Sequence, residues 1–320
     1  MSTAPARGSF EIGGDFRHEA MFYRGLDAWL DGATSFVREG LASEEPTLVV
    51  AGTYKLAALK KELGPGADLV QFADMAEVGL NPARIIPAWT DFLERSAPES
   101  QRVRGIGEPI WAERSPEELI ECQRHESLLN VAFADSPGWW LLCPYDVGEL
   151  PPDVLEEARR SHPFLWQSGV HTESLIYRDL ETAAAPFDAP LPAAPGSAES
   201  MSLELNNLFL VRDRVARAAM AHGLDDGRAS DLVLSVNELA GNSLRHGGGA
   251  GTLRIWTQGR ALICEITDTG RIDKPLVGRE RPTTDQERGF GLWLVNQLCD
   301  LVQLRTFDTG SVVRLHMARA

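Results

Sequence analysis

The sequence predicts two α/β domains that differ in construction. In residues 10–182, helix-like and strand-like patterns alternate, which favours a sheet with parallel strand pairs. In residues 201–320, two long amphipathic patterns precede strands joined by tight-turn signals, which indicates helices on one face of a mainly antiparallel sheet. Residues 183–200 are mostly Ala, Pro, Gly and Ser, and we expect an extended linker there.

Length and composition are those of a globular protein. The chain has 320 residues, more than a single small core usually organises, which supports the two domains. It is 43% hydrophobic and 24% charged, and no apolar run approaches the ~20 residues that span a bilayer. The N-terminal stretch MSTAPARGSF lacks the apolar segment of a secretory signal. We therefore expect a cytoplasmic protein with no membrane partner.

The excess negative charge lies in the first part of the chain. The formal net charge is −15: residues 201–320 carry 15 Lys and Arg against 14 Asp and Glu, whereas residues 1–200 carry 16 against 32. Such a surface repels phosphate backbones, so we expect no direct nucleic-acid partner. The four cysteines show no CxxC or CxxH spacing, which favours buried reduced thiols over a cysteine zinc site.

The elements of the first domain follow from its periodicity. We expect a helix over 18–41, because its apolar residues recur at near-helical spacing. A strand at 47–52, a helix at 55–63, a strand at 69–72 and a helix at 82–95 follow. Ser115 opens another helix with a capping-box spacing to Glu118, 139–146 predicts a strand, and 161–164 predicts a helix end followed by a strand.

In the second domain we expect amphipathic helices over 206–222 and 229–246. The strands 252–258 and 261–267 flank the hairpin signal Gly259-Arg260. A helix follows over 292–300, and two further strands, LVQLRTF and SVVRLHM, turn at Asp308-Thr309-Gly310. These elements predict an α/β sandwich.

A polar stripe on the helix 229–246 offers metal-ligating and basic groups. Ser235, Glu238, Asn242 and Arg245 line this stripe, beside an apolar stripe of Leu232, Val236, Leu239 and Ser243. The Asn242 amide oxygen suits Mg²⁺, and the Glu238 carboxylate stands where it can take a proton from an attacking hydroxyl. Taken alone, the pair also fits a solvated helix face.

Two further motifs follow this helix in fixed order. Asp268 ends an apolar strand, where a buried carboxylate needs a donor such as the exocyclic amine of adenine, and Gly270 lets a base approach the backbone. Gly289 and Gly291 precede the helix 292–300 and present backbone amides to an anion. Each motif alone has an ordinary explanation, a strand-ending turn or a glycine before a helix, but together they predict an ATP site.

These motifs carry a family resemblance. The pattern VRDRVARAA, LVLSVNELAGNSLRHG, ITDTG, RGFGLWLVNQLCD over 206–300 resembles the GHKL ATPase module with its Bergerat fold, and within it the RsbW-type anti-sigma serine kinases. The resemblance implies Glu238 as catalytic base, Asn242 as Mg²⁺ ligand and Asp268 as adenine-binding residue. It places Gly270, Gly289 and Gly291 in the nucleotide loops. Among the cations of the predicted lid 271–288, we choose Arg288 as a phosphate-binding residue because it adjoins the glycines.

The first domain resembles the MEDS sensory domain. The matching segments are RHEAMFY, GIGEPIW, HESLLN, CPYD and SHPF, and the whole chain resembles actinobacterial regulators of the RsbA type. The resemblance implies a RecA-like α/β fold, yet the segment after strand 47–51 lacks the GxxxxGK[ST] phosphate loop. The candidate sensory-pocket residues are His18, Tyr23, Glu126 and Tyr145, chosen from a wider polar set that also includes Glu108, Cys143, Asp146 and His162. The alternative is that these are caps, turns and satisfied core polar groups.

Three functions follow for comparison. The first is a serine/threonine protein kinase that uses Mg-ATP to phosphorylate a STAS-type anti-anti-sigma protein, sequesters a sigma factor and is controlled by the sensory domain. The second is an ATP-gated anti-sigma or anti-anti-sigma clamp without useful turnover. A histidine kinase is disfavoured, because the Pro-rich 183–205 segment cannot form the helix pair that presents a phospho-accepting histidine. The resemblance also implies a homodimer through the second domain.

Overall fold

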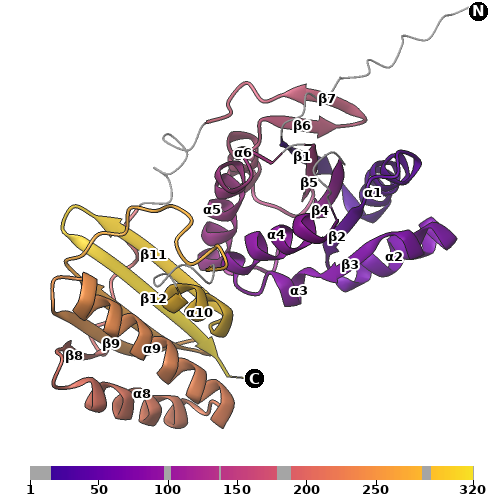
Figure 1. Ribbon diagram of the computed structural model, residues 1–320. Helices are drawn as coiled ribbons and strands as arrows, with labels where there is room; N and C mark the ends of the chain where they lie inside the picture. Colours follow the sequence, from indigo (N-terminus) through magenta and orange to yellow (C-terminus); the bar gives the residue numbers. More distant parts are fainter. Residues whose placement is uncertain (1–15, 97–101, 137, 179–188, 283–289, 320) are drawn as a thin grey trace, which may run out of the picture.

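The computed structural model describes residues 16–96, 102–136, 138–178, 189–282 and 290–319, and Figure 1 shows two domains joined along one side. No helix within these ranges has the length and apolar character that crossing a bilayer requires.

The N-terminal domain is built on a seven-stranded sheet. The strand order is β3-β2-β4-β5-β1-β6-β7, and all neighbours pair in parallel except β6 and β7, which are antiparallel. The strands are β1 (Arg17–Tyr23), β2 (Thr47–Ala51), β3 (Gln71–Asp74), β4 (Val103–Gly107), β5 (Trp139–Asp146), β6 (Phe164–Gln167) and β7 (Val170–Glu173). The predicted parallel α/β class is confirmed.

Helices cover both faces of this sheet. α1 (Gly25–Ala42) and α2 (Thr53–Leu63) bury one face, and α4 (Ile85–Ser96), α5 (Pro116–Ala132) and α6 (Pro152–Ser161) bury the other. Short turns of helix, η1 (Gly64–Leu69), α3 (Met75–Val78) and η2 (Pro82–Arg84), connect them. Because side chains alternate along a strand, His18 of β1 faces the α4–α6 side, whereas Tyr23 packs with α1 and α2.

The predicted helix over 18–41 is wrong at its start. Residues 17–23 form β1, a central strand. α1 begins only at Gly25, whose φ of 72° lies in the left-handed region that favours glycine. Every residue of β1 is buried, so the strand shows no polar–apolar alternation. His18 and Glu19 of this strand have partners far along the chain, which the local pattern does not reveal.

The other predicted elements of this domain form within a few residues of their expected limits. Ser115 caps α5: its Oγ accepts from Glu118 N, and a Glu118 carboxylate oxygen accepts from Ser115 N at 2.8 Å. α6 ends at Ser161, His162 follows as its cap, and β6 begins two residues later. The sequence did not predict β4, which lies between β2 and β5.

The C-terminal domain is a two-layer sandwich. Its antiparallel sheet has the order β11-β12-β10-β9-β8, made of β8 (Glu199–Leu203), β9 (Gly251–Gln258), β10 (Ala261–Asp268), β11 (Leu301–Phe307) and β12 (Gly310–Ala318). α8 (Leu208–His222), α9 (Asp226–His246) and α10 (Phe290–Leu298) pack on one face of the sheet. The predicted helices and hairpins form, and the GHKL-type sandwich is confirmed.

The segment before this sheet crosses its other face. The buried Arg314 pairs with Glu265 and donates from Nη2 to the Pro192 carbonyl at 2.6 Å. β8 starts at Glu199, inside the predicted linker 183–200, and pairs with β9. The domain limits themselves stay a prediction.

The two domains contact each other through α5 and η2. Along α5, Glu117 accepts from Gln258 of β9 at 3.0 Å, and Arg124 donates to the Leu304 carbonyl of β11 at 2.5 Å. Leu276, from the segment after β10, packs against the N-terminal core. The interface therefore involves the helix-free side of the C-terminal sheet, which meets α5, and helix α10, which meets η2.

Candidate functional site

The end of α9 is hydrogen-bonded to the DTG turn. Ser243 Oγ donates to Asp268 Oδ2 at 2.5 Å, and Gly270 N donates to Asp268 Oδ1 at 2.9 Å. Thr269 Oγ1 donates to the Gly247 carbonyl at 3.1 Å. The carboxylate of Asp268 is thus fixed by two donors and retains acceptor capacity for a third.

Glycines hold this junction together because no Cβ fits. A Cβ at Gly270 would stand 2.6 Å from the His246 carbonyl oxygen, and one at Gly247 would stand 2.4 Å from Asp268 Cγ. The backbone of α9 and the DTG turn therefore approach more closely than side chains allow. The result is a tight junction that holds the Asp268 carboxylate beside the end of α9.

Gly291 brings the third motif to the helix stripe. A Cβ at this position would lie 3.2 Å from Glu238 Oε2 and 3.0 Å from Asn242 Nδ2. Both side chains are half-buried, so the first turn of α10 and the polar stripe of α9 face each other. Arg288 and Gly289 lie outside the described residues.

The burial of the apolar stripe of α9 agrees with expectation, and that of the polar stripe agrees only in part. Leu232, Val236, Leu239 and Ser243 are buried against the sheet side. Arg245 Nη2 donates to Asn242 Oδ1 at 3.1 Å, which leaves one lone pair of that oxygen for another partner. Ser235 departs from the polar stripe: it is fully buried and donates to the Asp231 carbonyl.

Three of the predicted lid cations, Arg271, Arg279 and Arg281, pair with acidic side chains outside the three motifs. Arg271 pairs with Asp273 and Asp308 in solvent, and Arg281 lies 3.5 Å from Asp91 of α4. Arg279 is 6% exposed and faces α5. Arg279 and Arg281 thus contact the N-terminal domain, whereas Arg271 stays within the C-terminal domain.

A buried charge cluster joins Arg279 to the N-terminal domain. Glu121 of α5 is 1% exposed, with Oε1 2.8 Å from Arg305 Nη1 and Oε2 3.6 Å from Arg279 Nη2, and neither contact has hydrogen-bond geometry. Burial, and then repulsion by Arg124, lowers the pKa of Arg279 to about 10, against the pull of Glu121. Two buried cations therefore share one anion.

An amide relay runs beside this cluster. Asn81 Nδ2 donates to the Asn296 carbonyl of α10 at 3.1 Å, and Asn296 Nδ2 donates to the Gly278 carbonyl at 2.8 Å. Gly278 has a φ of 72°, and a Cβ there would lie 2.7 Å from Leu292 Cγ. The N-terminal domain, α10 and the segment after β10 are thereby linked by buried amides.

Comparison with known proteins agrees with both parts of the fold. Residues 17–163 match the MEDS family, the MEthanogen/methylotroph, DcmR Sensory domain. Residues 201–317 match the histidine kinase-like ATPase domain. The chain joins a MEDS domain to a histidine kinase-like ATPase domain. The resemblance drawn from the motifs is confirmed, and ATP binding follows from the second match.

Solved structures add only a distant likeness. The structure of the RsbU and RsbW domains of Rv1364c from Mycobacterium tuberculosis is 16% identical over 39% of this chain and 33% of that chain, with a TM-score of 0.30. This chain thus spans about a third of its length, and a likeness at this level does not bear on function. No curated protein matches the chain.

The predicted sensory-pocket residues of the MEDS domain fall into two groups. His18 and Glu126 meet in the core on the α4–α6 side, and the Tyr145 ring lies 5.5 Å from that of His162 in the same region. Burial, and then the proximity of His162, lowers the pKa of His18 to about 4. Tyr23 is not brought into this group.

Tyr23 belongs to a cluster at the carboxyl ends of the strands. Its hydroxyl donates to Glu108 Oε1 at 2.6 Å, and Lys55 Nζ donates to the same oxygen at 2.7 Å. Burial raises the pKa of Glu108, and burial followed by Glu108 itself raises that of Tyr23. A hollow beside Tyr23 is lined also by Trp166. Ligands of open parallel sheets bind at this edge.

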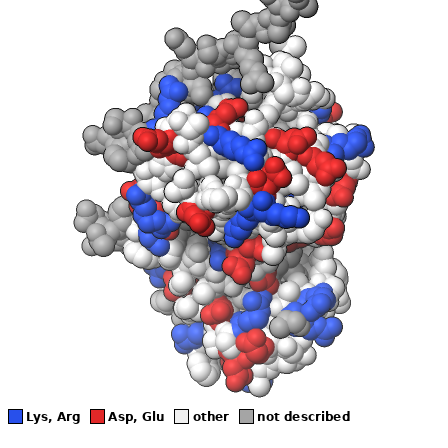
Figure 2. Space-filling view, turned by 90° about the vertical axis from the view of Figure 1, so that its right-hand side faces the viewer, with Lys and Arg blue, Asp and Glu red and all other residues white. Residues whose placement is uncertain are grey.

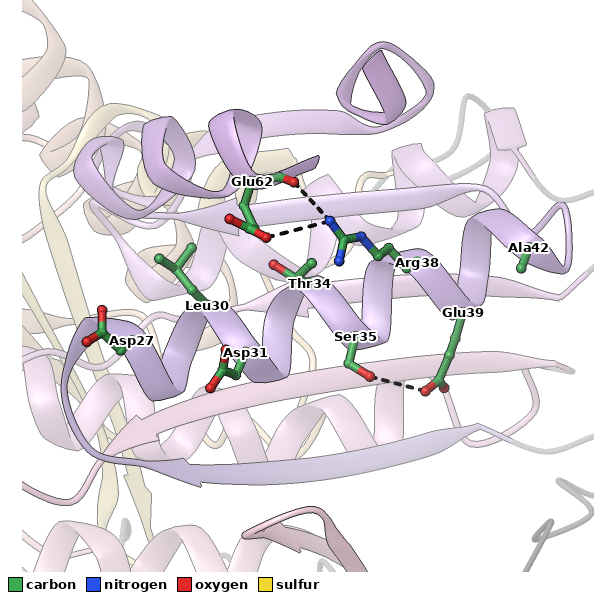
Figure 3. A pocket seen from close by; sticks show the side chains of 9 residues that line it. All are labelled: Asp27, Leu30, Asp31, Thr34, Ser35, Arg38, Glu39, Ala42 and Glu62. Atoms are coloured by element: carbon green, nitrogen blue, oxygen red, sulfur yellow. Dashed lines mark hydrogen bonds and ion pairs between the residues drawn. The ribbon is translucent and has the colours of Figure 1, made fainter. Parts of the chain in front are cut away.

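A second hollow lies beside α1 in the described part of the chain. Figure 3 shows this hollow on the outer face of α1, where Arg38 donates to the Glu62 carbonyl of α2 at 3.0 Å. The Arg38–Glu62 ion pair is more than half exposed and thus contributes little. On the face shown in Figure 2, acidic and basic side chains are interspersed.

Sequence reasoning missed the residues that join the motifs. Ser243 was assigned to the apolar stripe, and Gly247 and Thr269 were given no role, yet they make the hydrogen bonds at the junction. The glycine run at 247–249 was the available signal, since Gly248 and Gly249 both have positive φ. Glu121, Asn81 and Asn296 gave no local signal, because their partners are on the other domain.

Proposed function

We propose that this chain is an anti-sigma regulatory serine/threonine protein kinase. It binds Mg-ATP, phosphorylates a STAS-type anti-anti-sigma protein and sequesters a sigma factor, under the control of its MEDS domain. The observation that carries the proposal is the convergence of Glu238, Asn242 and Gly291, with Asp268 fixed at the end of α9. The match to the histidine kinase-like ATPase domain supports it.

The residues fit a magnesium nucleotide. Gly270 packs against the His246 carbonyl oxygen and donates to the Asp268 carboxylate, and a Cβ at Gly291 would fill the space against Glu238 and Asn242. Asn242 Oδ1 would hold the metal, with waters and phosphate oxygens as its other ligands. When bound, Mg²⁺ neutralises charge on the phosphates.

The protein's own side chains would then position the nucleotide and deprotonate the attacking hydroxyl. Asp268 would accept a hydrogen bond from the exocyclic amine of adenine, while Ser243 and the Gly270 amide donate to its carboxylate and fix its position. Glu238 accepts the proton of the attacking serine hydroxyl, as the half-buried base beside the phosphate site. The helix N-terminus of α10 presents amides to the anion.

The test is phosphate transfer from labelled ATP to a panel of STAS-domain proteins from the same organism. Wild-type protein should label one serine, and Glu238→Gln and Asn242→Ala should lose the transfer. Asn206→Ala, an exposed residue of the same domain, is the control and should retain it. ATP binding without transfer to any protein of the panel would instead support the ATP-gated clamp. No ATP binding would contradict both.

The domain interface supports control of the lid by the MEDS domain. The described lid residues contact the MEDS domain through Glu121–Arg279, Arg281–Asp91 and the Asn81–Asn296–Gly278 relay. A signal that shifts α5 or η2 would therefore change how the segment folds over the nucleotide.

The Asn81→Ala variant tests this control without touching the nucleotide residues. It removes the donor of the relay, so a fluorescent ATP analogue should dissociate several-fold faster from the full chain. The Asn206→Ala variant should match wild type. Equal dissociation rates for Asn81→Ala and wild type would contradict the coupling, while leaving the kinase test unaffected.

A further inference from the structure

Four side chains with metal-binding atoms converge in the core of the MEDS domain. They are His18 of β1, Glu126 of α5, Cys143 of β5 and His162 at the end of α6, and one ligand atom from each lies within 4.8 Å of all the others. All four are at most 1% exposed. The cluster lies outside the nucleotide site and shares no residue with the Tyr23 cluster.

The spacing of these atoms suits a small tetrahedral ion. Glu126 Oε2 lies 3.2 Å from His18 Nε2 and 3.2 Å from His162 Nε2, and Cys143 Sγ lies 3.3 Å from His18 Nε2. Zinc bonds to nitrogen and oxygen of about 2.0–2.1 Å and to sulfur of about 2.3 Å give tetrahedral edges of about 3.3–3.6 Å. These three edges lie within a few tenths of an ångström of the tetrahedral values, and all six distances among the four atoms are at most 4.8 Å.

Both histidines are oriented by hydrogen bonds from Nδ1, as is typical of histidines that bind a metal through Nε2. His162 Nδ1 donates to the Ala158 carbonyl at 2.7 Å, and His18 Nδ1 donates to Asn130 Oδ1 at 3.0 Å. Asn130 Nδ2 donates to the Ser161 carbonyl at 2.7 Å, which fixes the amide so that its oxygen faces His18. With the protons on Nδ1, both Nε2 lone pairs point at the cluster, the arrangement that outer hydrogen bonds impose on metal ligands.

With both histidine protons on Nδ1, the Cys143 thiol is the one donor within the cluster, and it lies 3.3 Å from His18 Nε2. Glu126 Oε1 and His162 Nε2 are buried and have no hydrogen-bond partner, although Nε2 lies close to the other carboxylate oxygen. In the described part of the chain, the contacts of the Glu126 carboxylate are with His18, His162 and Cys143, and none is Lys or Arg. A buried carboxylate facing two acceptor nitrogens is costly. A divalent ion would balance the carboxylate and a Cys143 thiolate.

From this geometry we infer that the MEDS domain binds one zinc ion through His18, Glu126, Cys143 and His162. All four ligands come from protein, which is the pattern of a closed site rather than one with an open position for substrate. His18 and His162 lie near the two limits of the MEDS match, so the ion ties the ends of this domain to α5. α5 also carries Glu121, which contacts the ATPase domain from another side of the helix.

The first test is elemental analysis of the full chain, expressed in zinc-containing medium and purified without chelator. We expect about one zinc per chain in wild type and a loss of at least ten-fold in Cys143→Ser and His162→Gln. Cys122→Ser is the matched control: its thiol is equally buried in the same core but donates to the Pro109 carbonyl, outside the cluster. That variant should retain the zinc. Retention of zinc by Cys143→Ser would overturn the assignment.

Cobalt substitution keeps the test independent of whether the variants fold. Co²⁺ added to chelator-treated wild-type protein should give the visible bands of a tetrahedral ion and a thiolate-to-cobalt band in the near ultraviolet, at one equivalent. Circular dichroism confirms that the treated protein is folded. Folded wild-type protein that holds less than about a tenth of an equivalent of metal and shows no cobalt bands would refute the site.

Discussion

Removing the Glu121 carboxylate should destabilise the whole chain, because two buried cations depend on it. The Arg305 and Arg279 side chains are 2% and 8% exposed, and Glu121 is their shared anion across the domain interface. Loss of one partner from a buried ion pair leaves an uncompensated charge and costs about 3–5 kcal/mol. We expect Glu121→Ala to lower the free energy of unfolding by about this amount.

The assay is urea unfolding of the full chain, followed by tryptophan fluorescence and circular dichroism. Glu117→Ala is the matched control, since Glu117 lies one turn earlier on α5 and makes an exposed hydrogen bond to Gln258; it should change stability by less than about 1 kcal/mol. The double variant Glu121→Ala/Arg305→Met should recover part of the loss, because an apolar side chain replaces one stranded charge. If Glu121→Ala unfolds within 1 kcal/mol of wild type, the cluster does not hold the domains together.

Three further changes test the ATPase domain. Gly270→Ala would place a Cβ 2.6 Å from a backbone carbonyl oxygen, so affinity for a fluorescent ATP analogue should fall at least about ten-fold. Gly196→Ala, with open space around it, is the control and should bind the analogue normally. Tight binding by Gly270→Ala would contradict the proposed adenine site. Leu232 is 0% exposed in the core, so Leu232→Ala should lower the free energy of unfolding by about 2–5 kcal/mol, measured with denaturant. Leu234 is 42% exposed on the same helix, and Leu234→Ala should lower it far less. Equal losses would disprove the burial of this stripe. Burial, and then the charge of Arg314, lowers the pKa of His316 to about 4 in the folded protein. In the unfolded protein the histidine binds its proton near pH 6.5. Stability should therefore be full above pH 6.5 and fall toward pH 4 by up to about 1.4 kcal/mol per pH unit from this group, and His316→Gln should flatten that slope; an unchanged slope would rule out His316 as its source.

Local sequence was sufficient where an element depends only on residues close to it in the chain. The capping box at Ser115, the amphipathic pattern of α9 and the turn at Gly310 each depend on residues a few positions apart, and the structure reproduces all three. The order of the nucleotide motifs was also readable, because each motif lies at the end of a regular element. Chain geometry then brings Asp268, Gly291 and the end of α9 together.

The central strand β1 could not be read in the same way. Arg17 and Glu19 form a buried ion pair, and His171 Nδ1 of the distant β7 lies 2.7 Å from Glu19 Oε1. Polar residues in a buried strand suggest exposure until their partners are known. Neighbouring apolar residues therefore merged with those of α1 into one helical pattern.

The sequence by itself determined the two domain types and their order, and it predicted the residues that face a nucleotide. Only the tertiary structure decided that His18, Glu126, Cys143 and His162 meet, and that Glu121 reaches across to Arg305. The physical reason is distance along the chain. Helix and strand periodicity report contacts within a few residues, whereas a buried cluster forms from elements that the sheet order and the packing of two domains bring together.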